Sequence, residues 1–174
     1  RTYLKKHLQD KKHSCEKISS FPNDFDNFYS SCSKELYFHF PKKRQWMDWR
    51  FCSKPNNPYT SFTIRERKRL TGYAVLKRWR DEDKYDKVHI MDFHASTSYS
   101  FKNLMAAAES YSHACDELNL WCMDGYAYLD PIQDVGFSLS VAPAKNIIIY
   151  NFLKQKLLPP SSSCSFMYGD FDGY

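Results

Sequence analysis

The alternation of hydrophobic and polar positions is clearest between residues 87 and 118. Apolar side chains dominate from Val88 to Met91 and give way to the polar Asp92 and His94, which predicts a buried strand over 88–94. Apolar residues then recur every three or four positions, which predicts an amphipathic helix whose buried face holds Phe101, Leu104, Met105, Ala108, Tyr111, Cys115 and Leu118. A strand that leads into a helix in this way often builds a ligand site, because helix N-termini carry backbone N–H groups without helical partners. The same layout also occurs in sheets without chemistry at that edge, so the pattern alone leaves both readings open.

Helical spacing also dominates the first third of the chain. It predicts a short helix over 3–12 and a second helix over 24–36. A third helical piece opens after Pro41 and contains Trp46 and Trp49, which their spacing assigns to a core more readily than to a ligand platform.

From Tyr59 onward the spacing of apolar residues becomes that of strands. Residues 59–64 and 70–79 are rich in β-branched and aromatic side chains, and the charged segment 65–69 between them reads as a turn. We therefore expect a hairpin with a basic tip. Its arginines and lysine are expected to be solvated, with RNA or an anionic sugar as the alternative ligand.

After the long helix the pattern becomes shorter and more mixed. It predicts a strand at 120–123, a short helix at 126–134, and strands at 137–141 and 146–152, before a break at Pro159–Ser163. The predicted fold class is α/β in the mixed α+β sense, with a central, mostly antiparallel sheet flanked by helices. Residues 1–20 are interpreted as an N-terminal helix that continues a missing preceding segment, and residues 21–174 as one domain.

The composition indicates a globular protein with an uneven distribution of charge. Aromatic residues make up 17% of the 174, which indicates a packed core rather than disorder. Residues 1–90 hold 21 Lys and Arg against 11 Asp and Glu, whereas residues 91–174 hold 4 against 9. The basic half could meet phosphate on a nucleotide or RNA, although solvated faces explain most such lysines.

The cysteines and the hydropathy indicate a cytoplasmic protein. Six cysteines lie scattered without metal-ligand spacing, so we read them as reduced thiols and expect no metal. The sequence holds no apolar run close to the roughly 20 residues of a membrane span, so we expect no membrane span.

Several local patterns resemble the GNAT acyltransferase superfamily, and more closely the C-terminal GNAT-like half of acetyltransferases from bacterial polysaccharide clusters. They span about residues 43–172 and comprise Trp49-Arg50-Phe51, Pro58-Tyr59, Gly72-Tyr73-Ala74-Val75-Leu76, Ile90-Met91-Asp92-Phe93, Asp134-Val135-Gly136-Phe137 and Tyr168-Gly169-Asp170-Phe171-Asp172. The resemblance implies transfer of an acyl group, from acetyl-CoA or another CoA thioester, to a small-molecule amine or amino-sugar acceptor.

The reaction that the resemblance implies needs a base and an acid, and particular residues are candidates for each role. Asp92 and His94 share a face because one residue separates them on a strand. His94 would be the general base, since histidine ordinarily titrates near neutrality, with Asp92 as its orienter or as a cation-binding group. The alternative is that Asp92 caps the next loop and His94 is a strand-end residue. Tyr126 or Tyr128 would be the general acid, unless each only packs.

The donor would lie on the end of the strand and the loop after it. Backbone N–H groups near Phe93 and His94 would contact the oxyanion, and the phosphates would meet the segment Ala95, Ser96, Thr97, Ser98 and Ser100. That segment lacks the glycines with which acetyl-CoA-binding relatives cradle the diphosphate, and close backbone approach is harder without them.

Three functions follow from the sequence. The first is an acetyl-CoA-dependent N-acyltransferase. The second is a related transferase that takes its acyl group from aminoacyl-tRNA, which would suit the basic first half. The third is a non-catalytic GNAT-like half that binds a partner or nucleic acid.

Overall fold

The structure is a computed structural model that describes residues 15–34, 38–80, 85–121, 128–138 and 164–165. In this part of the chain the elements run in the order β1 (Glu16–Ile18), α1 (Phe25–Cys32), β2 (Phe38–His39), α2 (Arg44–Phe51), β3 (Tyr59–Glu66), β4 (Arg69–Arg80), β5 (Asp86–Ala95), α3 (Ser98–Tyr111), β6 (Glu117–Leu120), α4 (Leu129–Asp134) and β7 (Cys164–Ser165).

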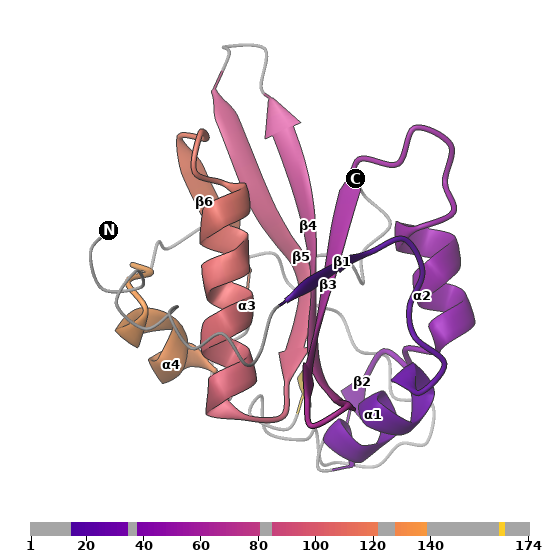
Figure 1. Ribbon diagram of the computed structural model, residues 1–174. Helices are drawn as coiled ribbons and strands as arrows, with labels where there is room; N and C mark the ends of the chain where they lie inside the picture. Colours follow the sequence, from indigo (N-terminus) through magenta and orange to yellow (C-terminus); the bar gives the residue numbers. More distant parts are fainter. Residues whose placement is uncertain (1–14, 35–37, 81–84, 122–127, 139–163, 166–174) are drawn as a thin grey trace, which may run out of the picture.

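A mixed sheet forms the middle of the molecule. Its strand order is β1-β3-β4-β5-β6, with antiparallel neighbours except for the parallel pair of β5 and β6. The short strands β2 and β7 form a separate parallel pair. Figure 1 shows α3 and α4 on one side of the sheet and α1 and α2 on the other. The predicted fold class, a mostly antiparallel sheet flanked by helices, is confirmed.

Each side of the sheet has its own hydrophobic core. The core under α3 joins strand residues such as Leu76, Ile90 and Phe93 to Leu104 of the helix, and the opposite core joins α1 and α2 to Tyr73. Strand side chains alternate between these two cores because successive residues of a strand point to opposite faces.

A β-bulge interrupts that alternation in β5. Val75 of β4 pairs with Asp92 while the next residue, Leu76, pairs with Ile90, so Met91 is the extra residue. Met91 and Asp92 consequently both face the side of α1 and α2. In a regular strand Ile90 and Phe93, three positions apart, would point to opposite faces. The bulge brings both side chains into the same core under α3.

The hairpin of β3 and β4 turns more tightly than predicted. Arg65 and Glu66 belong to β3, and only Arg67 and Lys68 form the turn, with φ angles of 48° and 72°. The expected five-residue basic tip is therefore wrong. Arg65 instead donates to both carboxylate oxygens of Asp24, at 2.8 and 2.7 Å.

The long helix is shorter than its pattern suggested. Thr97 is the N-cap, in place of Ser98 or Ser100, because its Oγ1 accepts from the backbone N–H of Ser100 at 3.0 Å. The helix ends at Tyr111, and Leu118 belongs to β6, where it pairs with Val88. The apolar spacing continued past the helix because β6 faces the same core.

The other predicted helices and strands agree with the structure to different degrees. Helices predicted at 24–36 and after Pro41 correspond to α1 and α2, and the helix predicted at 126–134 begins at Leu129. The strand predicted at 120–123 is misplaced, because β6 spans Glu117–Leu120 and shares only Leu120 with it. The helix at 3–12 and the strand at 146–152 lie outside the described residues, as does most of the strand at 137–141. Residues 16–18 pair antiparallel with β3 as an edge strand.

Candidate functional site at the end of strand β5

The pairing of the two parallel strands ends near the middle of β5. The pairing of β5 with β6 runs from Lys87 opposite Glu117 to Ile90 opposite Leu120. β5 continues to Ala95, and among the described residues no strand pairs with it on this edge beyond Ile90. The predicted residues Asp92, Phe93, His94 and Ala95 therefore lie on the part of β5 beyond the end of β6. We take this edge as the candidate site.

Asp92 lies at the bottom of the site and is completely buried. Its Oδ1 accepts from Nζ of Lys42 at 2.8 Å and from the hydroxyl of Tyr73 at 3.1 Å. Lys42 is itself 4% exposed, so the two opposite charges neutralise each other inside the protein. Asp92 thus pairs with a protein cation, Lys42.

His94 shares the face of Asp92, as expected for positions two apart on a strand. Its half-buried ring lies among aromatic rings, with centroid distances of 6.1 Å to Phe28, 6.5 Å to Tyr29 and 5.7 Å to Tyr128. Burial, followed by the nearby charge of Lys42, lowers the pKa of His94 to about 4. The imidazole is therefore neutral at pH 7, able to accept a proton or hydrogen bond but weakly basic.

Tyr128, just before α4, lies against the part of β5 beyond its pairing with β6. Its ring stacks on Phe101 at 5.6 Å, lies 5.3 Å from Phe93, and meets His94 on the other side of the strand. Its hydroxyl donates to the backbone oxygen of Ala95. Burial raises the pKa of Tyr128 to about 12, which makes the phenol a weaker acid than usual. Tyr126, the other predicted acid, lies outside the described residues.

The serine-rich loop is held together by its own hydroxyl groups. Ser96 hydrogen bonds through both its backbone N–H and its hydroxyl to the carbonyl of Thr71, at 2.8 and 3.1 Å. Ser98 is exposed at the first turn of α3, whereas Ser100 is fully buried and lies 2.7 Å from Oγ1 of Thr71.

A carboxylate already lies at the N-terminus of α3. Oε1 of Glu66, the last residue of β3, accepts from the hydroxyls of Thr97 at 2.5 Å and Ser100 at 2.8 Å. An anion is favoured there by the positive end of the helix dipole. A phosphate at the same place would meet the negative charge of Glu66 and hydroxyl protons already donated to it. In this conformation the loop does not fit the diphosphate of CoA.

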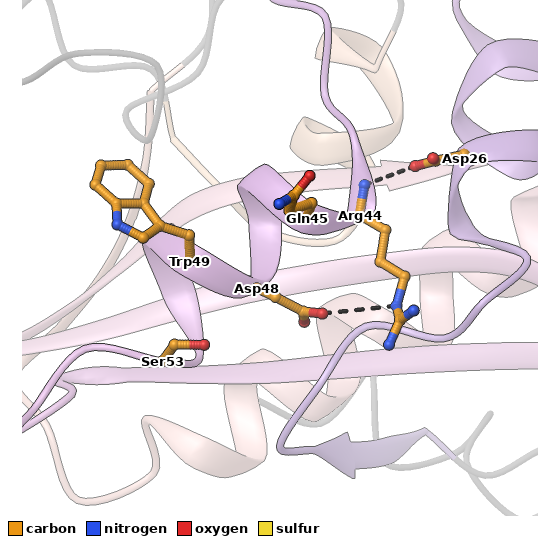
Figure 2. Close-up of a pocket in the computed structure, with 6 residues that line it drawn as sticks. All are labelled: Asp26, Arg44, Gln45, Asp48, Trp49 and Ser53. Atoms are coloured by element: carbon orange, nitrogen blue, oxygen red, sulfur yellow. Dashed lines mark hydrogen bonds and ion pairs between the residues drawn. The ribbon is translucent and has the colours of Figure 1, made fainter.

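An open depression of about 550 Å³ lies elsewhere, on the layer of α1 and α2. Figure 2 shows that Arg44 approaches Asp26 and Asp48 across it, while the exposed Trp49 points away. The backbone N–H of Arg44 donates to Asp26 at 2.6 Å, and its side chain lies 3.6 Å from Asp48. The first contact joins α1 to α2 and the second lies within α2. We assign the depression no part in the candidate site.

The described residues give two further findings. They include no group of three or more His, Cys, Asp or Glu side chains placed to hold a metal ion. None of their helices has the length and apolar character needed to cross a membrane.

Sequence reasoning missed three residues of the site. Lys42 lies 50 positions from Asp92, and no local pattern joins them. Tyr73 was assigned to a strand, but its hydroxyl partner depends on the register of β4 against β5. Glu66 follows the alternation of a strand and was read as part of a turn, so its contact with α3 gave no signal.

Comparisons with known proteins agree with the architecture. No protein-family model and no curated protein matches the sequence. Among solved structures, the chain is similar to an aminoglycoside acetyltransferase from an uncultured soil metagenomic sample, which was solved in complex with sisomicin. The TM-score is 0.57 and the sequence identity is 13%, and the match covers 83% of this chain and 99% of that chain.

Two further solved structures are similar. A ribosomal-protein-alanine N-acetyltransferase from Brucella melitensis biovar Abortus 2308 has a TM-score of 0.61 and 8% identity, with 80% of this chain and 99% of that one covered. An aminoglycoside N-acetyltransferase in complex with CoA has a TM-score of 0.54 and 14% identity, with 80% and 93% covered. The chain therefore has the fold of the GNAT N-acetyltransferases.

Proposed function

We propose that this protein is a GNAT-type N-acyltransferase that moves an acyl group from a thioester donor, such as acetyl-CoA, to a small-molecule amine. The observation that supports this function is the end of the pairing between β5 and β6 at Ile90, with His94 and Tyr128 in contact beside the remaining length of β5. The likeness to acetyltransferases of aminoglycosides supports an amine or amino-sugar acceptor.

His94 and Tyr128 differ in how well they meet the chemical requirements of acyl transfer. The reaction needs an acceptor for an amine proton and a donor for the leaving thiolate. His94 is neutral at pH 7 and offers a hydrogen-bond acceptor to the amine, but with a pKa of about 4 it is a poor general base. We therefore assign it to orienting the amine.

Tyr128 is positioned differently from a ready general acid. Its hydroxyl proton is donated to the carbonyl of Ala95 and its pKa is about 12. The phenol would have to leave Ala95 before it could protonate a thiolate. Its present contacts fix the edge of β5 against α3 through Phe101.

A thiol-release assay tests the proposed function. The protein is incubated with an acetyl thioester and a panel of amino sugars, aminoglycosides and polyamines, and free thiol is measured over time. We expect acceptor-dependent release, and a fall of about 10²-fold in kcat/KM for His94→Ala, because loss of a positioning contact misaligns the amine. His113→Ala, at an exposed histidine after α3, is the matched control. Equal rates with and without every acceptor would contradict the proposal.

A second candidate function is a non-catalytic module that binds nucleic acid. The carboxylate of Glu66 at the N-terminus of α3 favours it, because this is where related enzymes would need a phosphate. Arg67, Lys68 and Arg69 are exposed beside it. Anisotropy of a labelled RNA tests this candidate: binding that weakens steeply with salt, and further when these three residues become Glu, would support it. A salt-independent signal would contradict it.

A further inference from the structure

Glu66 is half-buried and hydrogen bonded into the N-terminus of α3. The residue before it, Arg65, is held by both oxygens of Asp24, at 2.8 and 2.7 Å, and also donates to the carbonyl of Lys68 at 2.8 Å. The end of β3 is therefore anchored on one side by α1 and on the other by its own turn. The carboxylate of Glu66 projects from this anchored backbone onto α3.

The partners of Glu66 are two hydroxyls at this helix N-terminus that could otherwise donate to a phosphate. Thr97 and Ser100 each have one hydroxyl proton, and both hydroxyls lie within hydrogen-bond distance of Oε1. The backbone N–H of Ser100 is taken by the Thr97 cap. Every residue from Ala95 to Ser100 carries a Cβ, so the backbone cannot approach a bulky anion as closely as glycine would allow.

We propose that Glu66 selects the acyl donor by placing its negative charge where the diphosphate would lie. A diphosphate is excluded from this position, so the nucleotide portion of CoA stays outside the site and adds nothing to recognition. The donor is then a thioester recognised at the edge of β5 through its acyl and thiol portions. This inference rests on the proposed function, but the exclusion of diphosphate is a property of the loop alone.

Calorimetric binding of three probes tests the proposal: acetyl-CoA, S-acetyl-pantetheine, which has the same thioester without the nucleotide, and inorganic pyrophosphate. For the native protein we expect the two thioesters to bind within threefold of each other and pyrophosphate not to bind. Glu66→Gln keeps the hydrogen-bond acceptor and removes the charge. In this variant we expect acetyl-CoA to gain at least tenfold in affinity and pyrophosphate to bind measurably, with S-acetyl-pantetheine unchanged.

Glu109→Gln is the matched control, since Glu109 lies near the other end of α3. It should change none of the three affinities. Circular dichroism and the melting temperature establish that both variants fold. If Glu66→Gln does not fold, the comparison of the two thioesters on the native protein decides, because it needs no variant.

Native protein that binds acetyl-CoA at least tenfold more tightly than S-acetyl-pantetheine overturns the proposal, as does a Glu66→Gln variant that binds acetyl-CoA less tightly. Failure of the acyltransferase function has a different signature. In that case neither thioester is consumed with any amine, while pyrophosphate still binds only when Glu66 is replaced.

Discussion

Lys42 and Asp92 form a buried ion pair, with 2.8 Å between Nζ and Oδ1, across 50 positions of sequence. The pair ties the segment before α2 to the bulged centre of β5. Tyr73 completes it by donating to the same oxygen at 3.1 Å. Since both side chains are almost fully buried, neither charge can be removed without leaving the other in a poorly solvated place.

Replacing one member of this pair should be costly. We expect Asp92→Asn to lower the free energy of unfolding by about 3–5 kcal/mol, because Lys42 loses its charged partner in the interior. Urea denaturation measures the change. The double variant Lys42→Met with Asp92→Leu should recover most of the loss, since it leaves no buried charge; a double variant as unstable as Asp92→Asn would contradict this account.

Protonation of His94 should destabilise the fold in acid. Its folded pKa of about 4 lies below the ordinary value of 6.5, so the unfolded chain binds more protons between these values. Stability is then fully present above pH 6.5 and falls as the pH drops to about 4, by roughly 3 kcal/mol at most. Urea midpoints across this range should show a shallower slope for His94→Gln. Parallel slopes for the two proteins would refute the assignment.

Gly72 allows α3 to lie close to the sheet. A Cβ built at this position would lie 2.8 Å from Cδ1 of Leu104 and 3.0 Å from the carbonyl oxygen of His94. Leu104 is fully buried and has little room to move. We expect Gly72→Ala to cost about 1–3 kcal/mol through overpacking, measured by thermal unfolding. Combination with Leu104→Ala should show less than additive loss; strict additivity would argue against this contact as the cause.

The backbone of the turn between β3 and β4 is strained, because both turn residues have a side chain and a positive φ angle. Arg67 and Lys68 both have positive φ, a conformation that matches the twist of a two-residue hairpin but favours Asn and Gly. Lys68→Gly should therefore stabilise the protein by about 0.5–1 kcal/mol, which a higher melting temperature would reveal. Lys102→Gly, at an exposed helical position, is the opposite control and should destabilise by a similar amount. A lower melting temperature for Lys68→Gly would contradict the strain.

Sequence patterns predicted the elements better than their ends. Apolar spacing located α3 and the alternation located β3 and β4, because both periods come from local backbone geometry. The end of α3 was misplaced from Tyr111 to Leu118, since helix and following strand face one core. The bulge at Met91 could not be predicted, because a shift of register depends on the partner strand.

The sequence by itself determined the fold class, the central strand and the helix after it, since these depend on the order and period of nearby side chains. It also placed Asp92 and His94 on one face. Only the tertiary structure decided what those residues are: Asp92 neutralises Lys42, His94 is uncharged among aromatic rings, and Glu66 covers the N-terminus of α3. Each of these three properties depends on burial and on partners far away in the chain. A local sequence pattern encodes neither the burial nor the distant partners.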